Sequence, residues 1–127
     1  MSDLRTPLAK VRGLGSAKGG THHWMMQKVT ALANIPLVLF VVVSFVGNVG
    51  KSHADWVAWF KQPLAAVIMI LFVLNTMHHL RLGLQVAVED YVPSHGNRTL
   101  VITLINFVVA ILAVLSVFSI LRIAFGG

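Results

Sequence analysis

The chain has 127 residues, of which 57% are hydrophobic and 11% charged, with a formal net charge of +6 and no cysteine. A soluble domain carries about 25% charged residues, so this composition excludes an ordinary water-soluble fold. The lack of cysteine excludes disulfides and iron–sulfur ligation by this chain. No basic helix or aromatic-basic face accompanies the positive charge, so nucleic acid is not an expected partner.

The first 21 residues are expected to form a basic arm outside the membrane. Half of the ten Lys and Arg residues occur before or at the start of the first apolar stretch: Arg5, Lys10, Arg12, Lys18 and Lys28. Because basic residues collect on the cytoplasmic side of membrane proteins, this bias predicts a cytoplasmic N-terminus. The arm has no apolar stretch ending in a small-residue cleavage site, so we do not expect a secretory signal. Its four glycines predict irregular structure over 13–20.

Three stretches without Lys, Arg, Asp or Glu follow, at 29–50, 62–80 and 99–121. They are 22, 19 and 23 residues long, and a helix needs about 20 mostly apolar residues to cross a bilayer. The sequence therefore predicts an all-α integral membrane protein. Its membrane domain would cover 22–127, with transmembrane helices at about 22–46, 63–91 and 98–124. Three crossings from a cytoplasmic N-terminus place the C-terminus in the periplasm of a bacterial host.

Proline and tryptophan mark the limits of these helices. Pro36 is expected to bend the first helix, because proline removes a backbone donor and clashes with the preceding turn. Pro63 is expected to open the second helix, and Pro93 to follow its end. Trp56 and Trp59 occur in the link between the first two helices, and indole rings collect at membrane–water boundaries.

The stretch HHLRLGLQVAVEDY, residues 78–91, concentrates polar side chains at the end of the second apolar run. If Tyr91 lies at the cytoplasmic boundary, His79 lies about 18 Å away along the axis, within the hydrocarbon. Ionisable side chains at such depth are candidates for a functional site. Helical geometry places His79, Gly83 and Asp90 on one face. Gly83 would allow close helix packing, or it would leave room for a flat macrocycle.

Two interpretations of His79 remain open from the residues alone. It is either a neutral imidazole bonded to a neighbouring helix or the axial ligand of a haem iron. His78 points about 100° away around the helix and cannot reach the opposite side of the same iron. His22 and His23 lie near the cytoplasmic boundary, too far along the membrane normal. A six-coordinate haem bound by His79 would therefore need its second histidine from another chain.

Other polar residues also have two interpretations. Asp90 needs a basic partner, which Lys28, Arg98 or an arginine of another protein chain would provide. Tyr91 is either an interfacial anchor or a hydrogen-bond donor to a small carbonyl ligand. Lys28 either sets the topology or contacts a haem propionate. Four further side chains are expected to form hydrogen bonds between helices: Asn34, Asn75, Thr76 and Asn106.

The motif H-x-x-x-G-x-Q-x-x-x-x-D-Y, from His79 to Tyr91, resembles the second helix of one of the two cytochrome b membrane anchor subunits of succinate dehydrogenase. GTHHWMMQKVTA resembles the start of the first helix in that family. RTPLAKVRGLGSAKGGTHHW is similar to the longer N-terminal form of its bacterial members. With the plan of three helices, the resemblance covers nearly the whole chain.

The resemblance implies a component of complex II in the bacterial inner membrane. In that complex a flavoprotein subunit oxidises succinate and an iron–sulfur subunit transfers the electrons. Two different anchor subunits reduce ubiquinone and hold one haem b between them. This chain offers no flavin site, cluster ligand or nucleophile, so we expect it to catalyse nothing alone.

The resemblance also implies roles for individual residues. His79 would bind the haem iron, with the opposite ligand from the second anchor subunit. Tyr91 would donate a hydrogen bond to a quinone carbonyl, and Asp90 would steady a basic residue of the second anchor subunit. Lys28 falls where the family usually has an arginine near the haem propionates, and lysine loses the two-pronged contact. His22 matches a histidine near the same propionates.

Three alternatives remain, of which the last two are less consistent with the sequence. The chain would serve equally as the anchor of a quinol:fumarate reductase, since the direction of electron flow depends on potentials. A small transporter or proton-relay protein would use His79, Asp90 and Glu89 and would bind no chromophore. If the chain were a purely structural assembly factor, the presence of His79 within the membrane would have no explanation.

Overall fold

The computed structural model describes residues 4–13 and 19–126, and every regular element in these ranges is helical. The helices are α1 (Pro7–Arg12), α2 (Gly20–Asn48), α3 (His53–Lys61), α4 (Pro63–Tyr91) and α5 (His95–Phe125). Of these, α2, α4 and α5 are long and apolar enough to cross a membrane. The prediction of an all-α membrane protein with three transmembrane helices is confirmed.

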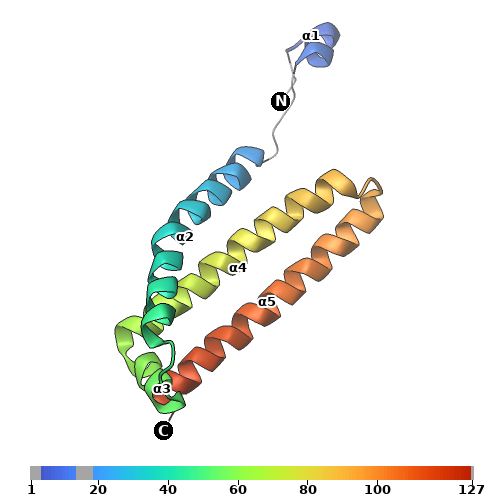
Figure 1. Ribbon diagram of the computed structural model, residues 1–127. Helices are drawn as coiled ribbons and strands as arrows, with labels where there is room; N and C mark the ends of the chain where they lie inside the picture. The colour runs from blue at the N-terminus through green and yellow to red at the C-terminus, as the bar shows by residue number, and fades with distance from the viewer. Residues whose placement is uncertain (1–3, 14–18, 127) are drawn as a thin grey trace.

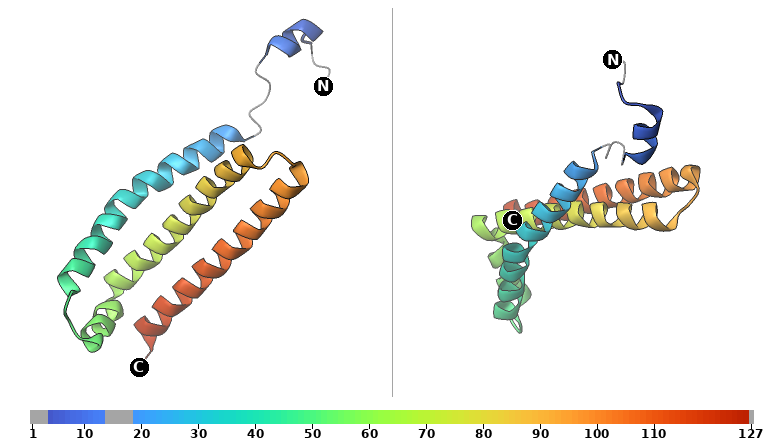
Figure 2. Two further views of the ribbon diagram at one scale, coloured as in Figure 1. Left: turned by 45° about the vertical axis from the view of Figure 1, so that its right-hand side comes forward. Right: turned by 90° about the horizontal axis from the view of Figure 1, so that it is seen from above.

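The three long helices form an uneven layer with α4 in the middle: α4 and α5 lie side by side, whereas α2 crosses out of their plane towards its C-terminal end (Figures 1 and 2). Helix α4 packs against α2 on one side and against α5 on the other. Neighbouring helices run in opposite directions, so the start of α2, the end of α4 and the start of α5 share one end of the layer. We call this the open end and the other, which carries α3 and the C-terminus, the α3 end.

Prolines and glycine set the helix boundaries largely as the sequence indicates. Pro63 is the first residue of α4, where its missing N–H has no helical partner to lose, and α4 ends two residues before Pro93. Helix α2 begins after Gly19, whose φ of 84° suits a residue without a side chain. It continues through Pro36 and bends, as predicted (Figure 1).

Compared with the predicted bounds, α2 and α5 extend slightly beyond 22–46 and 98–124 at both ends. The division into a basic arm and a membrane domain stays a prediction. The short α1 lies within that arm and was not expected. Most of the stretch predicted to be irregular, residues 14–18, lies outside the described residues.

Helix α3 is a second element that the sequence analysis treated only as a link. It begins with a capping box, in which the Ser52 hydroxyl accepts from the Asp55 backbone N–H and the Asp55 carboxylate accepts from the Ser52 backbone N–H. The Ser52 hydroxyl also donates to Asp55 Oδ2 at 2.8 Å. These side-chain and backbone hydrogen bonds lower the pKa of Asp55. The motif SHAD therefore nucleates a helix between the first two membrane spans.

Aromatic side chains of α3 pack against those of α2. Trp56 meets Phe45 with ring centroids 4.9 Å apart in an edge-to-face arrangement, and Trp59 stacks on Phe40 at 6.1 Å. The small buried core lies at the same end and consists of Ala66, Met69 and Ile120. Most other apolar side chains point outward, as expected where lipid or partner subunits cover a layer one helix thick.

Candidate functional site

A row of polar side chains joins α2 to α4 within the apolar layer. We call it the polar seam, and it consists of Thr30, Asn34, Asn75, Thr76 and His79. Asn75 Nδ2 donates to Asn34 Oδ1 at 2.8 Å and to the Thr30 carbonyl at 2.9 Å, and Thr76 Oγ1 donates to Asn34 Oδ1 at 3.2 Å. The prediction that these asparagines and Thr76 bond between helices is confirmed.

His79 occupies one end of the polar seam. Its Nδ1 lies 2.9 Å from the hydroxyl oxygen of Thr30. That hydroxyl donates its single proton to the carbonyl of Met26 at 2.8 Å, with the Gln27 carbonyl at 3.1 Å as the second acceptor. With its proton on the Met26 carbonyl, the Thr30 hydroxyl can accept from a His79 ring that carries a proton on Nδ1. In that tautomer the lone pair lies on Nε2.

The bond to Thr30 agrees with the first interpretation of His79, and the haem-ligand interpretation stays a prediction. The imidazole is bonded to a neighbouring helix, and the second ring nitrogen remains available to a ligand. His79 is half-buried, and so is Gly83 one turn further along α4. A Cβ atom at Gly83 would meet nothing within 4 Å, so no close helix contact within this chain requires the glycine. The face of α4 below His79 is open, as the prediction of room for a flat group requires.

His78 points to the other side of α4. It lines a cleft of about 180 Å³ between α4 and α5, together with Arg81 and Asn106. The expected divergence of the two neighbouring histidines is confirmed, because His79 bonds to α2 instead. Asn106, also expected to bond between helices, makes no side-chain hydrogen bond within the described ranges, so that expectation is wrong for this chain alone. The Nε atom of Arg81 is buried without a hydrogen-bond partner in the same part of the structure.

The remaining predicted site residues are exposed at or near the open end. Tyr91 is 86% exposed, and Asp90, Lys28 and His22 are also exposed. Lys28 Nζ lies 5.8 Å from the centre of the Trp24 ring, a cation–π arrangement. The structure thus does not bring these four residues into contact with His79; it places them at the end of the layer that the chain itself leaves uncovered.

Neither basic residue suggested as the partner of Asp90 pairs with it. Arg98 donates instead to the carbonyls of Val92 and Pro93, at 3.1 and 3.4 Å, where α4 has ended and its last carbonyls need donors. Within the part of the chain that the structure describes, Asp90 makes no hydrogen bond or ion pair. The in-chain pairing is therefore wrong, and a basic residue from another protein chain stays the prediction.

The sequence analysis missed the role of two residues of α2. Thr30 was passed over, although it lies one turn before Asn34 and therefore on the same face. His23 is half-buried with Nε2 buried and unpartnered, whereas the predicted His22 is exposed. His23 lies seven residues before Thr30, two helical turns, so both share the face that meets α4. The seven-residue spacing was the available signal.

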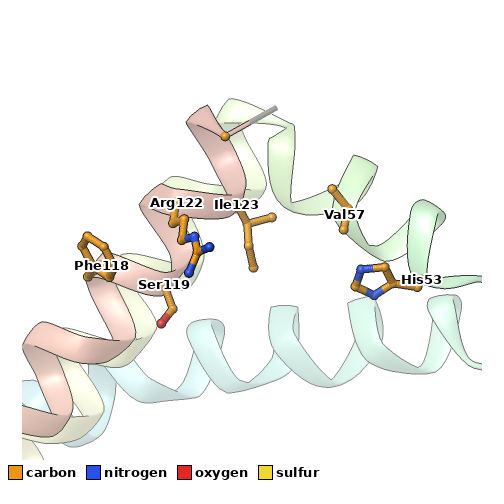
Figure 3. Close-up of a pocket in the computed structure, with 7 residues that line it drawn as sticks. His53, Val57, Phe118, Ser119, Arg122 and Ile123 are labelled. Carbon is orange, nitrogen blue, oxygen red and sulfur yellow. The ribbon is translucent and has the colours of Figure 1, made fainter.

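The α3 end contains a separate hollow of about 390 Å³ between α3 and α5 (Figure 3). Arg122 and Ser119 of α5 and His53 of α3 supply its polar groups, and Val57 and Ile123 are among its apolar walls. It contains none of the predicted site residues. Within residues 4–13 and 19–126, no group of three or more His, Asp or Glu side chains is arranged to hold a metal ion.

The fold and the polar seam together define a class: a small helical membrane protein that bonds a histidine of one transmembrane helix to its neighbour and leaves polar side chains exposed at one end. Residues 2–114 match the family model described as succinate dehydrogenase/fumarate reductase transmembrane subunit. The match covers most of the chain, and the chain belongs to this family.

Curated relatives agree with the family. A succinate dehydrogenase hydrophobic membrane anchor subunit from Rickettsia bellii is 31% identical over 119 residues, covering 86% of this chain and 94% of the relative. The protein of the same name from Paracoccus denitrificans is 32% identical, covering 96% of this chain and 94% of its own. A succinate dehydrogenase membrane anchor subunit from Reclinomonas americana is 24% identical, with 76% and 80% covered. The chain thus lies among the membrane anchor subunits of succinate dehydrogenase.

Proposed function

We propose that this chain is one of the two membrane anchor subunits of a bacterial succinate:ubiquinone oxidoreductase. It would share a haem b with the second anchor subunit and form part of the ubiquinone-reduction site. The observation that carries the proposal is the hydrogen bond between His79 Nδ1 and Thr30, which leaves Nε2 for a ligand, together with the open space at Gly83 one turn further along α4. The family and the names of the relatives supply the context.

The residues around His79 fit a haem. A metal-binding histidine normally donates its other ring N–H to a neighbouring acceptor, and the Thr30 hydroxyl lies 2.9 Å from His79 Nδ1, where it can accept such a bond. The open face at Gly83 gives a planar macrocycle room along α4. His78 faces the cleft between α4 and α5, so a second histidine for the haem iron would come from the second anchor subunit. When bound, the haem would supply a one-electron redox centre between the two anchor subunits.

Lys28 and His22 would hold the haem propionates. Both are exposed near the start of α2, on the side of His79 towards the open end. A lysine ammonium attracts a carboxylate as a point charge without the planar fork of an arginine. His23 shares the face of Thr30 and has an unpartnered buried Nε2, so it would provide a further donor on the same helix.

Ubiquinone would bind at the open end. The Tyr91 phenol, exposed in this chain, would donate a hydrogen bond to a quinone carbonyl oxygen and so stabilise the negative charge that develops there during reduction. Asp90 would pair with a basic residue of the second anchor subunit and hold it beside the quinone. The iron–sulfur subunit would supply the two electrons, and two protons would enter from the cytoplasm to complete the quinol.

The partners and location follow from the same proposal. The chain would assemble with the second anchor subunit, the iron–sulfur subunit and the flavoprotein in the bacterial inner membrane, with the open end on the cytoplasmic side. The structure gives the alternative proton relay no support, because Glu89 accepts from Gln85 at 2.9 Å and His79 bonds to Thr30. An anchor for a quinol:fumarate reductase would use the same groups; the names of the relatives favour succinate oxidation.

The test is a reduced-minus-oxidised visible spectrum of the detergent-purified complex. We expect the band of a b-type haem in the wild type and its loss or shift in His79→Ala, because the iron loses one axial nitrogen. His78→Ala is the matched control and should retain the band, since His78 faces α5. An unchanged band in His79→Ala would remove the role proposed for His79.

A further inference from the structure

We propose that Thr30 is the positioning residue of the haem ligand. Its hydroxyl would hold the His79 ring in one orientation and one tautomer, with the proton on Nδ1 and the lone pair of Nε2 directed towards the iron. This inference rests on the haem role proposed for His79. It assigns a function to a residue that is 5% exposed and that lies on a different helix from the ligand.

The first step is that the Thr30 side chain is itself fixed. Its hydroxyl bonds back to the Met26 carbonyl at 2.8 Å, the i−4 pattern that threonine adopts inside helices. The β-branched side chain has few rotamers available in a helix. The hydroxyl oxygen therefore presents its lone pairs towards α4 in one fixed direction.

The second step concerns the protons. A hydroxyl group has one proton, and the Met26 carbonyl accepts it. If His79 carried its proton on Nε2, its Nδ1 would be an acceptor facing the oxygen of Thr30, and the hydroxyl would have to give up its backbone bond to donate. The hydroxyl can keep its bond to the Met26 carbonyl and also bond His79 only with the Nδ1–H tautomer. That tautomer is the one in which Nε2 can bind iron.

The third step is that α4 is held to Thr30 at two points. Asn75 donates to the Thr30 carbonyl at 2.9 Å, and His79, one turn further along α4, meets the Thr30 hydroxyl at 2.9 Å. Asn34 accepts from Asn75 and Thr76 one turn away on α2. These bonds fix the rotation of α4 about its own axis. The direction of the His79 side chain therefore depends on all the hydrogen bonds of the polar seam. Thr30 is the residue of the seam that contacts the imidazole ring.

The test compares Thr30→Val and Thr30→Ser in the whole purified complex. Valine keeps the branched shape and removes the hydroxyl, while serine keeps the hydroxyl. We expect Thr30→Val to weaken haem retention about tenfold, as loss of a histidine's outer hydrogen-bond partner does at metal sites. It should also shift the midpoint potential and the low-temperature EPR signal of the oxidised haem. Thr30→Ser should keep haem retention, the midpoint potential and the EPR signal close to those of the wild type.

The matched control is Thr103→Val on α5. The Thr103 hydroxyl bonds back to the Thr99 carbonyl at 2.8 Å in the same way, but it is exposed and has no histidine beside it. This variant should leave the haem potential and EPR signal unchanged. If Thr30→Val does not assemble, Thr30→Ala removes the hydroxyl with a smaller side chain and is measured in its place.

The outcomes separate the two proposals. A wild-type potential and EPR signal in Thr30→Val would overturn the role of Thr30 while leaving His79 as the ligand. A shifted signal in Thr30→Ser equal to that of Thr30→Val would also overturn it, because side-chain shape and not the hydroxyl would be responsible. Retention of the haem band in His79→Ala would instead contradict the proposed function itself.

Discussion

The two ends of the helix layer are held together by different interactions. At the α3 end, aromatic rings and a small apolar core join four helices, with Trp59 in contact with both groups. Towards the open end, α2 and α4 are joined by the hydrogen bonds of the polar seam. Lipid tails are as apolar as the helices, so apolar burial drives helix association weakly in a membrane. Close aromatic packing and buried hydrogen bonds have to replace it.

The two ends also differ in the role that we assign to them: the α3 end stabilises the fold, and the open end would carry the function. At the α3 end aromatic rings pack between helices, whereas the open end leaves Tyr91, Asp90 and Lys28 exposed. Exposed polar side chains at this end are consistent with the contacts to other subunits and to quinone that we propose. The hydrogen bonds of the polar seam would hold His79 in a fixed position relative to α2. Substitutions at each region test this division.

The largest effect is expected at Tyr91. Tyr91→Phe should lower succinate:ubiquinone reductase activity by about 10- to 100-fold, the range expected from losing one hydrogen bond to an oxygen that gains negative charge. Because the side chain is 86% exposed in this chain, the thermal midpoint of the complex should hardly change. Succinate oxidation with a soluble artificial electron acceptor serves as the control and should be unaffected. Equal loss of both activities would place the defect outside the quinone site.

The second prediction concerns the α3 end. Trp59→Ala should destabilise the complex by about 2 kcal/mol, because Trp59 packs on Phe40, Trp56 and Phe60 and on the apolar core. The thermal unfolding midpoint would report this loss. The haem spectrum of the folded complex should remain that of the wild type. A changed spectrum would show that the two ends are coupled more strongly than their separate interactions suggest.

The smallest effect is expected at Asn75. Asn75→Leu should destabilise the complex by about 1 kcal/mol, since hydrogen bonds between membrane helices contribute roughly 0.6 kcal/mol each and Asn75 makes two. Unlike Trp59→Ala, it should also shift the haem potential, because α4 loses one of its two contacts to Thr30. The same measurements on Asn106→Leu provide the control. Asn106 makes no side-chain hydrogen bond within the described residues, so neither property should change.

Features that depend on local chemistry could be predicted from the residues alone. Long apolar stretches defined the three spans, and proline set the start of α4 and the bend of α2. The capping box at Ser52 and Asp55 is equally local and would have predicted α3. The motif from His79 to Tyr91 pointed to the right family. Each of these signals involves residues within a few turns of one another.

Which side chains meet across the helices depends on the packing of the whole chain. Helices α2, α4 and α5 are apolar on nearly all sides, so their patterns do not show which face meets which neighbour. The pairing of Thr30 with His79, the direction of His78 towards α5 and the engagement of Arg98 with carbonyls all depend on how the helices rotate and pack. In a layer of uniformly apolar helices, a few buried hydrogen bonds set that rotation, because each unpaired polar group is costly away from water.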